Sequence, residues 1–137
     1  QQQQRQQQQE RGLVGKLKGR VSDAPFIGCG GYVNNIGGAT VTGFGEAIMK
    51  VTLARDVVYN MENGQNAQES AENALEKMKR LVNGHGGVVT IDKEGNFGKA
   101  FTTHMMVWAS IKSNTMEFGM EKDEVEVELV KLNGEHK

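Results

Sequence analysis

The sequence predicts an α+β fold in which paired helices cover a sheet. Short apolar segments with strand character come before and after two consecutive amphipathic segments, so strands and helices occur in blocks rather than in βαβ alternation. Gly occurs 18 times in 137 residues and Pro once. Glycine at roughly twice its average frequency permits close backbone approaches, which suit a layered protein with a loop-built site.

Composition and charge exclude several classes of protein. Charged residues make up 24% of the chain and the formal net charge is −1, which argues against a disordered acidic chain and a basic nucleic-acid-binding protein. No apolar run approaches the ~18 residues of a membrane helix, and no charged-then-apolar leader opens the chain. We therefore expect a cytoplasmic protein with no membrane or nucleic-acid partner. The lone Cys29 excludes an internal disulfide and a multi-cysteine zinc site.

The first two strands are expected at residues 26–30 and 39–42. Both segments are short and rich in small or β-branched residues, as in strands that are buried on both faces. Gly37 and Gly38 between them are typical of a turn.

Two helices are predicted next. Apolar residues recur at three- and four-residue spacing over residues 47–61 and again over residues 67–81. Asn66, with Glu69 three positions later, is typical of a capping box at the start of the second helix.

A β-hairpin is predicted after the helices. Residues 88–91 and 97–103 alternate with period two around a polar turn at residues 92–96. A last strand is expected near residues 115–119. Residues 125–128 could extend an edge strand, although a solvated acidic tail is the simpler interpretation.

The spacing of the glycines argues against a nucleotide-binding motif, and the spacing of the histidines argues against a metal site. The glycine pair 28 and 30 would need a third glycine where Val33 stands, and the pair 43 and 45 would need one where Ile48 stands. No two histidines have metal-ligand spacing. We expect neither a cofactor nor a metal.

The segment Thr42-Gly43-Phe44-Gly45 is the first candidate for chemistry. It ends a predicted strand and opens a predicted helix, so backbone N–H groups would lie beside a hydroxyl. Such an arrangement can stabilise an anion or a developing oxyanion. From the residues alone, an ordinary strand-to-helix turn remains the simpler interpretation.

The segment from Arg20 to Asp23 is the second candidate. An arginine fork can bind a carboxylate and an aspartate can accept from an ammonium group, so the pair could hold an α-amino acid. Pro25, the only proline, would stiffen the loop. A local salt bridge within the loop is the alternative.

Three motifs occur in a fixed order: Gly19-Arg20-Val21-Ser22-Asp23-Ala24-Pro25, Gly28-Cys29-Gly30-Gly31-Tyr32-Val33-Asn34-Asn35 and Thr42-Gly43-Phe44-Gly45-Glu46. Together they resemble the β-subunit of the plant-type asparaginases, the isoaspartyl peptidase/L-asparaginase members of the N-terminal-nucleophile hydrolases. The pattern is nearest to the animal asparaginase-like proteins. The resemblance implies an asparaginase β-subunit-like domain at residues 12–130. It would lie between a disordered glutamine-rich tract, residues 1–11, and a polar tail, residues 131–137.

The resemblance implies an αββα sandwich and an amidohydrolase. Family enzymes hydrolyse the side-chain amide of L-asparagine or an isoaspartyl bond with an N-terminal threonine, whose own amino group acts as the base. By the family pattern, Arg20 would hold the α-carboxylate of L-asparagine, L-aspartate or an isoaspartyl dipeptide, and Asp23 would hold the α-amino group. The Thr42 hydroxyl and the Gly43 N–H would form the oxyanion hole. The pocket lining would be Val21, Ser22, Phe44 and Gly45.

The chain also departs from the family pattern. It contains no threonine before Thr40, so the nucleophile is missing from this sequence and the sandwich is expected to be incomplete. Ser22 replaces a family glycine and Phe44 replaces a residue that is commonly histidine. His104 and Met105 replace small or polar residues near the pocket wall. We therefore expect a chain that is inactive alone.

Three interpretations remain open from the sequence. The chain could be a truncated or degenerate β-subunit. It could belong to a working asparaginase whose missing strands lie on another chain, such as an α-subunit, or were lost from an incomplete gene model. An α-subunit or a homo-oligomer is a possible partner. The chain could also be a non-catalytic amino-acid-binding or interaction protein derived from the family.

Overall fold

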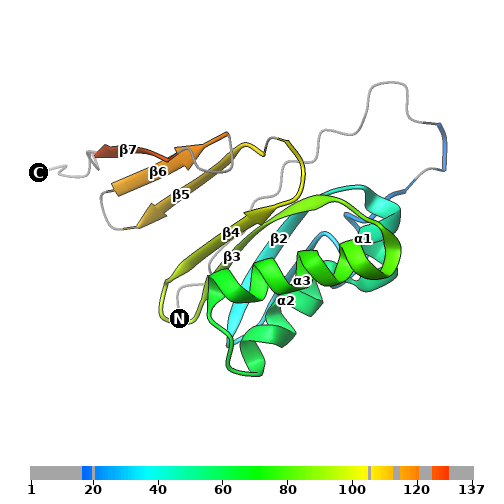
Figure 1. The fold of residues 1–137 in the computed structure, drawn as a ribbon, viewed down its shortest axis with the longest axis horizontal. Coiled ribbons are helices and arrows are strands. Elements are labelled where there is room, and N and C mark those ends of the chain that lie inside the picture. Colours follow the sequence, from blue (N-terminus) through cyan, green and yellow to red (C-terminus); the bar gives the residue numbers. More distant parts are fainter. Residues whose placement is uncertain (1–16, 20, 105, 113–114, 121–124, 130–137) are drawn as a thin grey trace, which may run out of the picture. The chain divides into compact units, whose positions relative to one another are not determined.

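The computed structural model describes residues 17–19, 21–104, 106–112, 115–120 and 125–129. The chain divides into two compact units, residues 1–102 and residues 103–137. Among the described residues, the first unit contains a four-stranded sheet with helices and the second contains a three-stranded sheet (Figure 1). Helices together with antiparallel sheets confirm the predicted α+β class.

The sheet of the first unit is antiparallel throughout. Its strands are β1 (Gly31–Val33), β2 (Gly37–Gly43), β3 (Gly86–Asp92) and β4 (Phe97–Phe101), in the spatial order β1-β2-β3-β4. The predicted strand at residues 39–42 and the predicted hairpin after the helices are confirmed as β2 and as β3 with β4.

One predicted helix is two helices in the structure. α1 (Gly45–Val51) and α2 (Leu53–Glu62) are separated by Thr52, whose φ of 47° places it in the left-handed region. A β-branched residue rarely adopts that conformation. The apolar stripe continues through the break, so the sequence pattern contained no sign of it.

The second predicted helix is confirmed as α3 (Ala67–Val82), which begins at the predicted capping box. The side chain of Asn66 accepts a hydrogen bond from the Glu69 backbone N–H at 2.8 Å. The Glu69 carboxylate accepts in return from the Asn66 backbone N–H at 3.4 Å. Both bonds satisfy N–H groups that a helix start otherwise leaves without partners.

The strand predicted at residues 26–30 is wrong. These residues form a series of turns, and the carbonyls of Gly28 and Cys29 accept hydrogen bonds from the N–H groups of Arg55 and Ala54 in the first turn of α2. The loop therefore provides the acceptors that the start of this helix needs. A short apolar segment rich in glycine does not distinguish such a loop from a strand.

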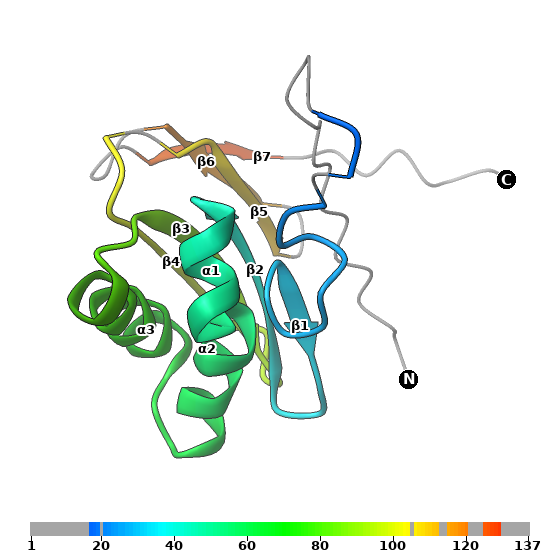
Figure 2. The same cartoon turned by 90° about the vertical axis from the view of Figure 1, so that its right-hand side faces the viewer.

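The core of the first unit lies between the helices and one face of the sheet (Figure 2). α2 packs on β1 and β2, and α3 packs on β3 and β4. Four strand residues at the centre of this face are at most 2% exposed: Ala39, Val41, Val88 and Thr90. The Thr90 hydroxyl, the polar group of that set, donates to the Gly38 carbonyl at 2.7 Å.

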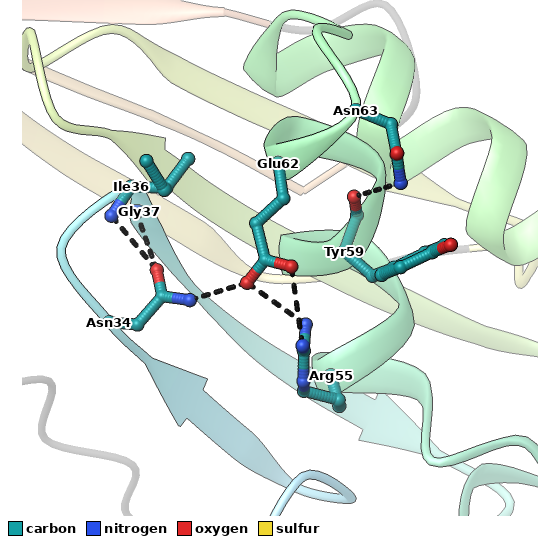
Figure 3. A network of polar contacts seen from close by, with 7 residues as sticks. All are labelled: Asn34, Ile36, Gly37, Arg55, Tyr59, Glu62 and Asn63. Atoms are coloured by element: carbon teal, nitrogen blue, oxygen red, sulfur yellow. Dashed lines mark hydrogen bonds and ion pairs between the residues drawn. The ribbon is translucent and has the colours of Figure 1, made fainter.

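A polar network attaches the β1–β2 turn to the end of α2 (Figure 3). The Glu62 carboxylate accepts from Asn34 Nδ2 at 2.6 Å and from Arg55 Nη2 at 3.2 Å. The Arg55 guanidinium also lies over the rings of Tyr32 and Tyr59, 4.9 and 5.8 Å from their centroids. Asn34 Oδ1 accepts from two backbone N–H groups of its own turn. The network connects two elements that are distant in sequence.

The second unit contains β5 (Trp108–Lys112), β6 (Thr115–Gly119) and β7 (Glu126–Leu129), with β6 between the other two. The predicted strand at residues 115–119 is confirmed. β5 was not predicted. β7 pairs with β6, so the interpretation of residues 125–128 as a solvated tail is wrong.

The glutamine-rich tract and the polar tail, residues 1–11 and 131–137, lie outside the described residues. None of the helices in the described ranges has the length and apolarity that a membrane crossing requires.

Candidate functional site

A buried carboxylate is the centre of the candidate site. Asp23 is 4% exposed, and its Oδ1 accepts a hydrogen bond from Ser22 Oγ at 2.9 Å. Its Oδ2 is buried and has no hydrogen-bond partner within the part of the chain that the structure describes. A buried carboxylate oxygen without a partner is costly, because it loses its hydration. The arrangement is suited to a ligand that brings a donor or a cation.

Gly45, the first residue of α1, allows Asp23 to occupy this position. A Cβ atom placed on Gly45 would lie 2.5 Å from Ser22 Oγ and 2.8 Å from Asp23 Oδ1. Real Cβ atoms do not approach other atoms so closely, so these two side chains depend on a glycine here. Gly45 is the third residue after Thr42, and Asp23 therefore borders the turn that the sequence analysis selected.

That turn is held by close backbone contact with the start of β3. Gly43 has a φ of 141°, and a Cβ there would lie 2.6 Å from both Gly86 Cα and the His85 carbonyl oxygen. The Phe44 N–H donates to the same His85 carbonyl at 3.2 Å. The side chain of Thr42 is exposed at the end of β2. The turn therefore presents a hydroxyl and a glycine backbone at a fixed position.

The negative charge of Asp23 affects the ionisation of the Cys29 thiol. Burial raises the pKa of the Cys29 thiol, and the negative charge of Asp23 raises it further. A thiol with a raised pKa is a poor nucleophile, since the thiolate is the reactive form. Cys29 is also 4% exposed, so it packs as a small buried residue.

The structure brings together only part of the predicted site. Asp23, Ser22 and Gly45 are in contact and adjoin the turn with Thr42. Arg20 lies outside the described residues. Two residues expected to line the pocket are exposed: Val21 at 54% and Phe44 at 57%.

Sequence reasoning missed two features of this site. The predicted pocket lining included Ser22 but not its hydrogen bond to Asp23 or its φ of 68°. His85, whose carbonyl accepts a hydrogen bond from the Phe44 N–H, was not among the candidate site residues. No local signal identifies either contact, because both depend on loops that meet in three dimensions.

No metal centre is found among the described residues. They contain no group of three or more His, Cys, Asp or Glu side chains that could hold an ion.

The comparisons with known proteins agree on one family. The family described as "Asparaginase" matches residues 10–120 of the chain. A protein named "Isoaspartyl peptidase/L-asparaginase" from Danio rerio is 46% identical over 110 residues, which cover 80% of this chain and 36% of that protein. Proteins of the same name from Xenopus laevis and Homo sapiens are 43% and 39% identical. They match over 80% and 85% of this chain and over 36% and 38% of their own lengths. The chain thus spans little more than a third of each relative.

Proposed function

This chain belongs to the asparaginase family, and on that premise we propose that it supplies the substrate-binding part of an amidohydrolase. The proposed enzyme hydrolyses the side-chain amide of L-asparagine and isoaspartyl bonds, and the chain corresponds to its β-subunit-like portion. The observation that carries the proposal is the buried Asp23 carboxylate, whose Oδ2 has no partner among the described residues. It lies beside the turn that carries Thr42 and Gly43.

Asp23 binds the α-ammonium group of the substrate. The Oδ2 atom accepts one charge-assisted hydrogen bond from the ammonium, which supplies the missing partner and compensates the buried negative charge. Arg20 binds the α-carboxylate through two parallel hydrogen bonds. An L-amino acid is thereby held by both of its backbone groups, and L-aspartate, the product, binds in the same way.

Thr42 and Gly43 form the oxyanion hole. The Thr42 hydroxyl and the Gly43 N–H donate to the side-chain carbonyl oxygen as negative charge develops on it. The Phe44 N–H already donates to His85, so it adds no third donor. Besides the groups that bind the substrate, the residues that line the proposed pocket are Val21, Ser22, Phe44 and Gly45.

The attacking threonine comes from outside these 137 residues. The sequence has no threonine before Thr40, so another chain, such as an α-subunit, or further sequence of the same protein supplies the nucleophile. A site that keeps its binding groups but lacks the nucleophile loses many orders of magnitude in rate. The chain alone is therefore inactive.

In the proposed complete enzyme, strands that this chain lacks form a second sheet on the face of the four-stranded sheet that points away from α2 and α3, which completes an αββα sandwich. On that face Val33 is 59% exposed and Phe97 is 38% exposed, while Val89 and Ile91 are half-buried. Packing against another sheet would bury these apolar side chains. The free thiol of Cys29 fits the expected cytoplasmic location.

Two assays test the proposal. The first measures ammonia and aspartate release by the purified chain from L-asparagine and from an isoaspartyl dipeptide, with Thr42→Ala as a control. No turnover is expected, and turnover that Thr42→Ala removes would contradict the external nucleophile. The second measures the melting temperature with L-aspartate, which should raise it. Arg20→Ala should abolish the increase, and an unchanged increase would contradict the pocket.

A further inference from the structure

We propose that Ser22 is a positioning residue, whose hydroxyl fixes the Asp23 carboxylate so that Oδ2 faces the substrate ammonium. The inference rests on the proposed role of Asp23. The Ser22 hydroxyl donates to Asp23 Oδ1 at 2.9 Å, while Oδ2 is buried without a partner among the described residues. The two oxygens of one carboxylate are thus divided between the protein and the ligand.

The backbone of Ser22 supports a specific role for its side chain. Ser22 has a φ of 68°, in the left-handed region that only glycine adopts without strain. Two other described non-glycine residues have positive φ, Thr52 and Asn83, and both lie at helix ends, where this conformation is common. Ser22 lies in a loop, where a glycine would adopt this φ without strain. An outlier of this kind indicates a function for the residue that maintains it.

The contact with Gly45 makes the arrangement rigid. Ser22 Oγ and Asp23 Oδ1 both lie against Gly45, where a Cβ would come within 2.5 and 2.8 Å of them. The hydroxyl and the glycine together restrict rotation of the carboxylate about its terminal bond. Without the hydroxyl, Oδ1 would lose the side-chain partner that it has among the described residues, and the carboxylate could turn either oxygen toward the ligand. The hydroxyl therefore preorganises the ammonium acceptor.

Two substitutions separate the hydroxyl from the backbone strain. Ser22→Ala removes the hydroxyl and keeps the strained φ, whereas Ser22→Gly removes both. Each variant of the full chain is titrated with L-aspartate and with succinate, which has the two carboxylates but no amine. Both variants should bind L-aspartate about threefold to tenfold more weakly than wild type, the effect of one hydrogen bond. Succinate binding should not change, and Ser22→Gly should melt at a higher temperature than Ser22→Ala.

Thr52→Gly is the matched control, because it also removes a side chain from a left-handed residue but lies away from Asp23 in the sequence. It should leave L-aspartate binding unchanged. Wild-type affinity for L-aspartate in both Ser22 variants would overturn the inference. An equal loss for succinate would also overturn it, since the effect would then not depend on the amine. A wild-type chain that binds L-aspartate no better than succinate would contradict the role of Asp23 itself.

Discussion

Two carboxylates at two regions around α2 are bonded in different ways. Glu62, the last residue of α2, accepts hydrogen bonds from Asn34 Nδ2 and Arg55 Nη2, and its Oε1 forms an ion pair with Arg55 Nη1 (Figure 3). Asp23 lies in the segment that leads to the loop at the start of α2, and its Oδ1 accepts a hydrogen bond from Ser22 Oγ. Asp23 is nevertheless the more buried of the two, because it is 4% exposed whereas Glu62 is an exposed residue.

The comparison separates a structural carboxylate from a binding carboxylate. Glu62 has every oxygen bonded, so it stabilises the attachment of the β1–β2 turn to α2. Asp23 Oδ2 is buried without a partner in the described residues, which decreases stability in the absence of ligand. The more deeply buried group is the less satisfied one, and the proposed role of Asp23 as the acceptor of a ligand ammonium would account for this difference.

The largest effect on stability is expected from adding a methyl group at Gly37, next to the β1–β2 turn that Glu62 attaches to α2. A Cβ on Gly37 would lie 2.5 Å from the Ile91 carbonyl oxygen and 2.7 Å from Met61 Cε. Because backbone cannot move away easily, Gly37→Ala should lower the free energy of unfolding by about 3 kcal/mol. Gly45→Ala meets side-chain atoms instead, so it should cost less stability but abolish L-aspartate binding. Urea unfolding and calorimetric titration of both variants measure these effects, and equal effects on binding would contradict the comparison.

The next largest effect is expected on the affinity for L-aspartate when Asp23 is changed. Asp23→Asn removes the negative charge that binds the ammonium, and affinity for L-aspartate should fall about 30-fold, the equivalent of about 2 kcal/mol. The free energy of unfolding should not decrease, because the variant no longer buries an uncompensated charge. Calorimetric titration measures the affinity. An unchanged affinity of Asp23→Asn for L-aspartate would contradict the assignment of Asp23 as the binding carboxylate.

The parts of the fold that depend on local patterns could be predicted from the sequence. The capping box at Asn66 and the β3–β4 hairpin are examples, because each signal lies within a few residues of the feature it predicts. The turns at residues 26–30 could not be predicted, since they depend on contacts with Ala54 and Arg55. The break at Thr52 interrupts the helix but not its apolar stripe.

The same distinction holds for the site. Asp23 and Thr42 could be selected because their chemistry matches an amino acid and an oxyanion. The contacts that place them could not, since Gly45 joins the two motifs across about twenty residues of chain and the Ser22 hydroxyl reaches Asp23 from a backbone with a positive φ. The residue types alone do not reveal either contact.

A smaller effect is expected at the structural carboxylate. Glu62→Gln removes the ion pair with Arg55, whose nitrogen and oxygen atoms are 3.2 Å apart. The free energy of unfolding should fall by about 1 kcal/mol, because both side chains are partly exposed. L-aspartate affinity should be unchanged. A double-mutant cycle with Arg55→Leu isolates the pair, and a loss of affinity in Glu62→Gln would remove the distinction between the two carboxylates.

The smallest effect is expected at a third carboxylate, Asp92 in the β3–β4 turn. Burial raises its pKa, but hydrogen bonds from the side chain and backbone of Asn96 and from the backbone of Glu94 outweigh burial and hold that pKa below its ordinary value. Its contribution to stability is therefore present above the ordinary pKa and is lost as pH falls through the lowered one. Asp92→Asn should flatten the stability curve below about pH 4. Urea unfolding from neutral to acidic pH measures this, and an unaltered curve would contradict the assignment.

The central claim is that Asp23 Oδ2 accepts from the ammonium group of the substrate. A crystal structure of the chain with L-aspartate bound tests it most directly. We predict the ammonium nitrogen within about 3 Å of Asp23 Oδ2, with Oδ1 still bonded to Ser22 and the ligand side chain directed at Thr42. An L-aspartate bound with its ammonium away from Asp23, or bound elsewhere on the chain, would contradict the account.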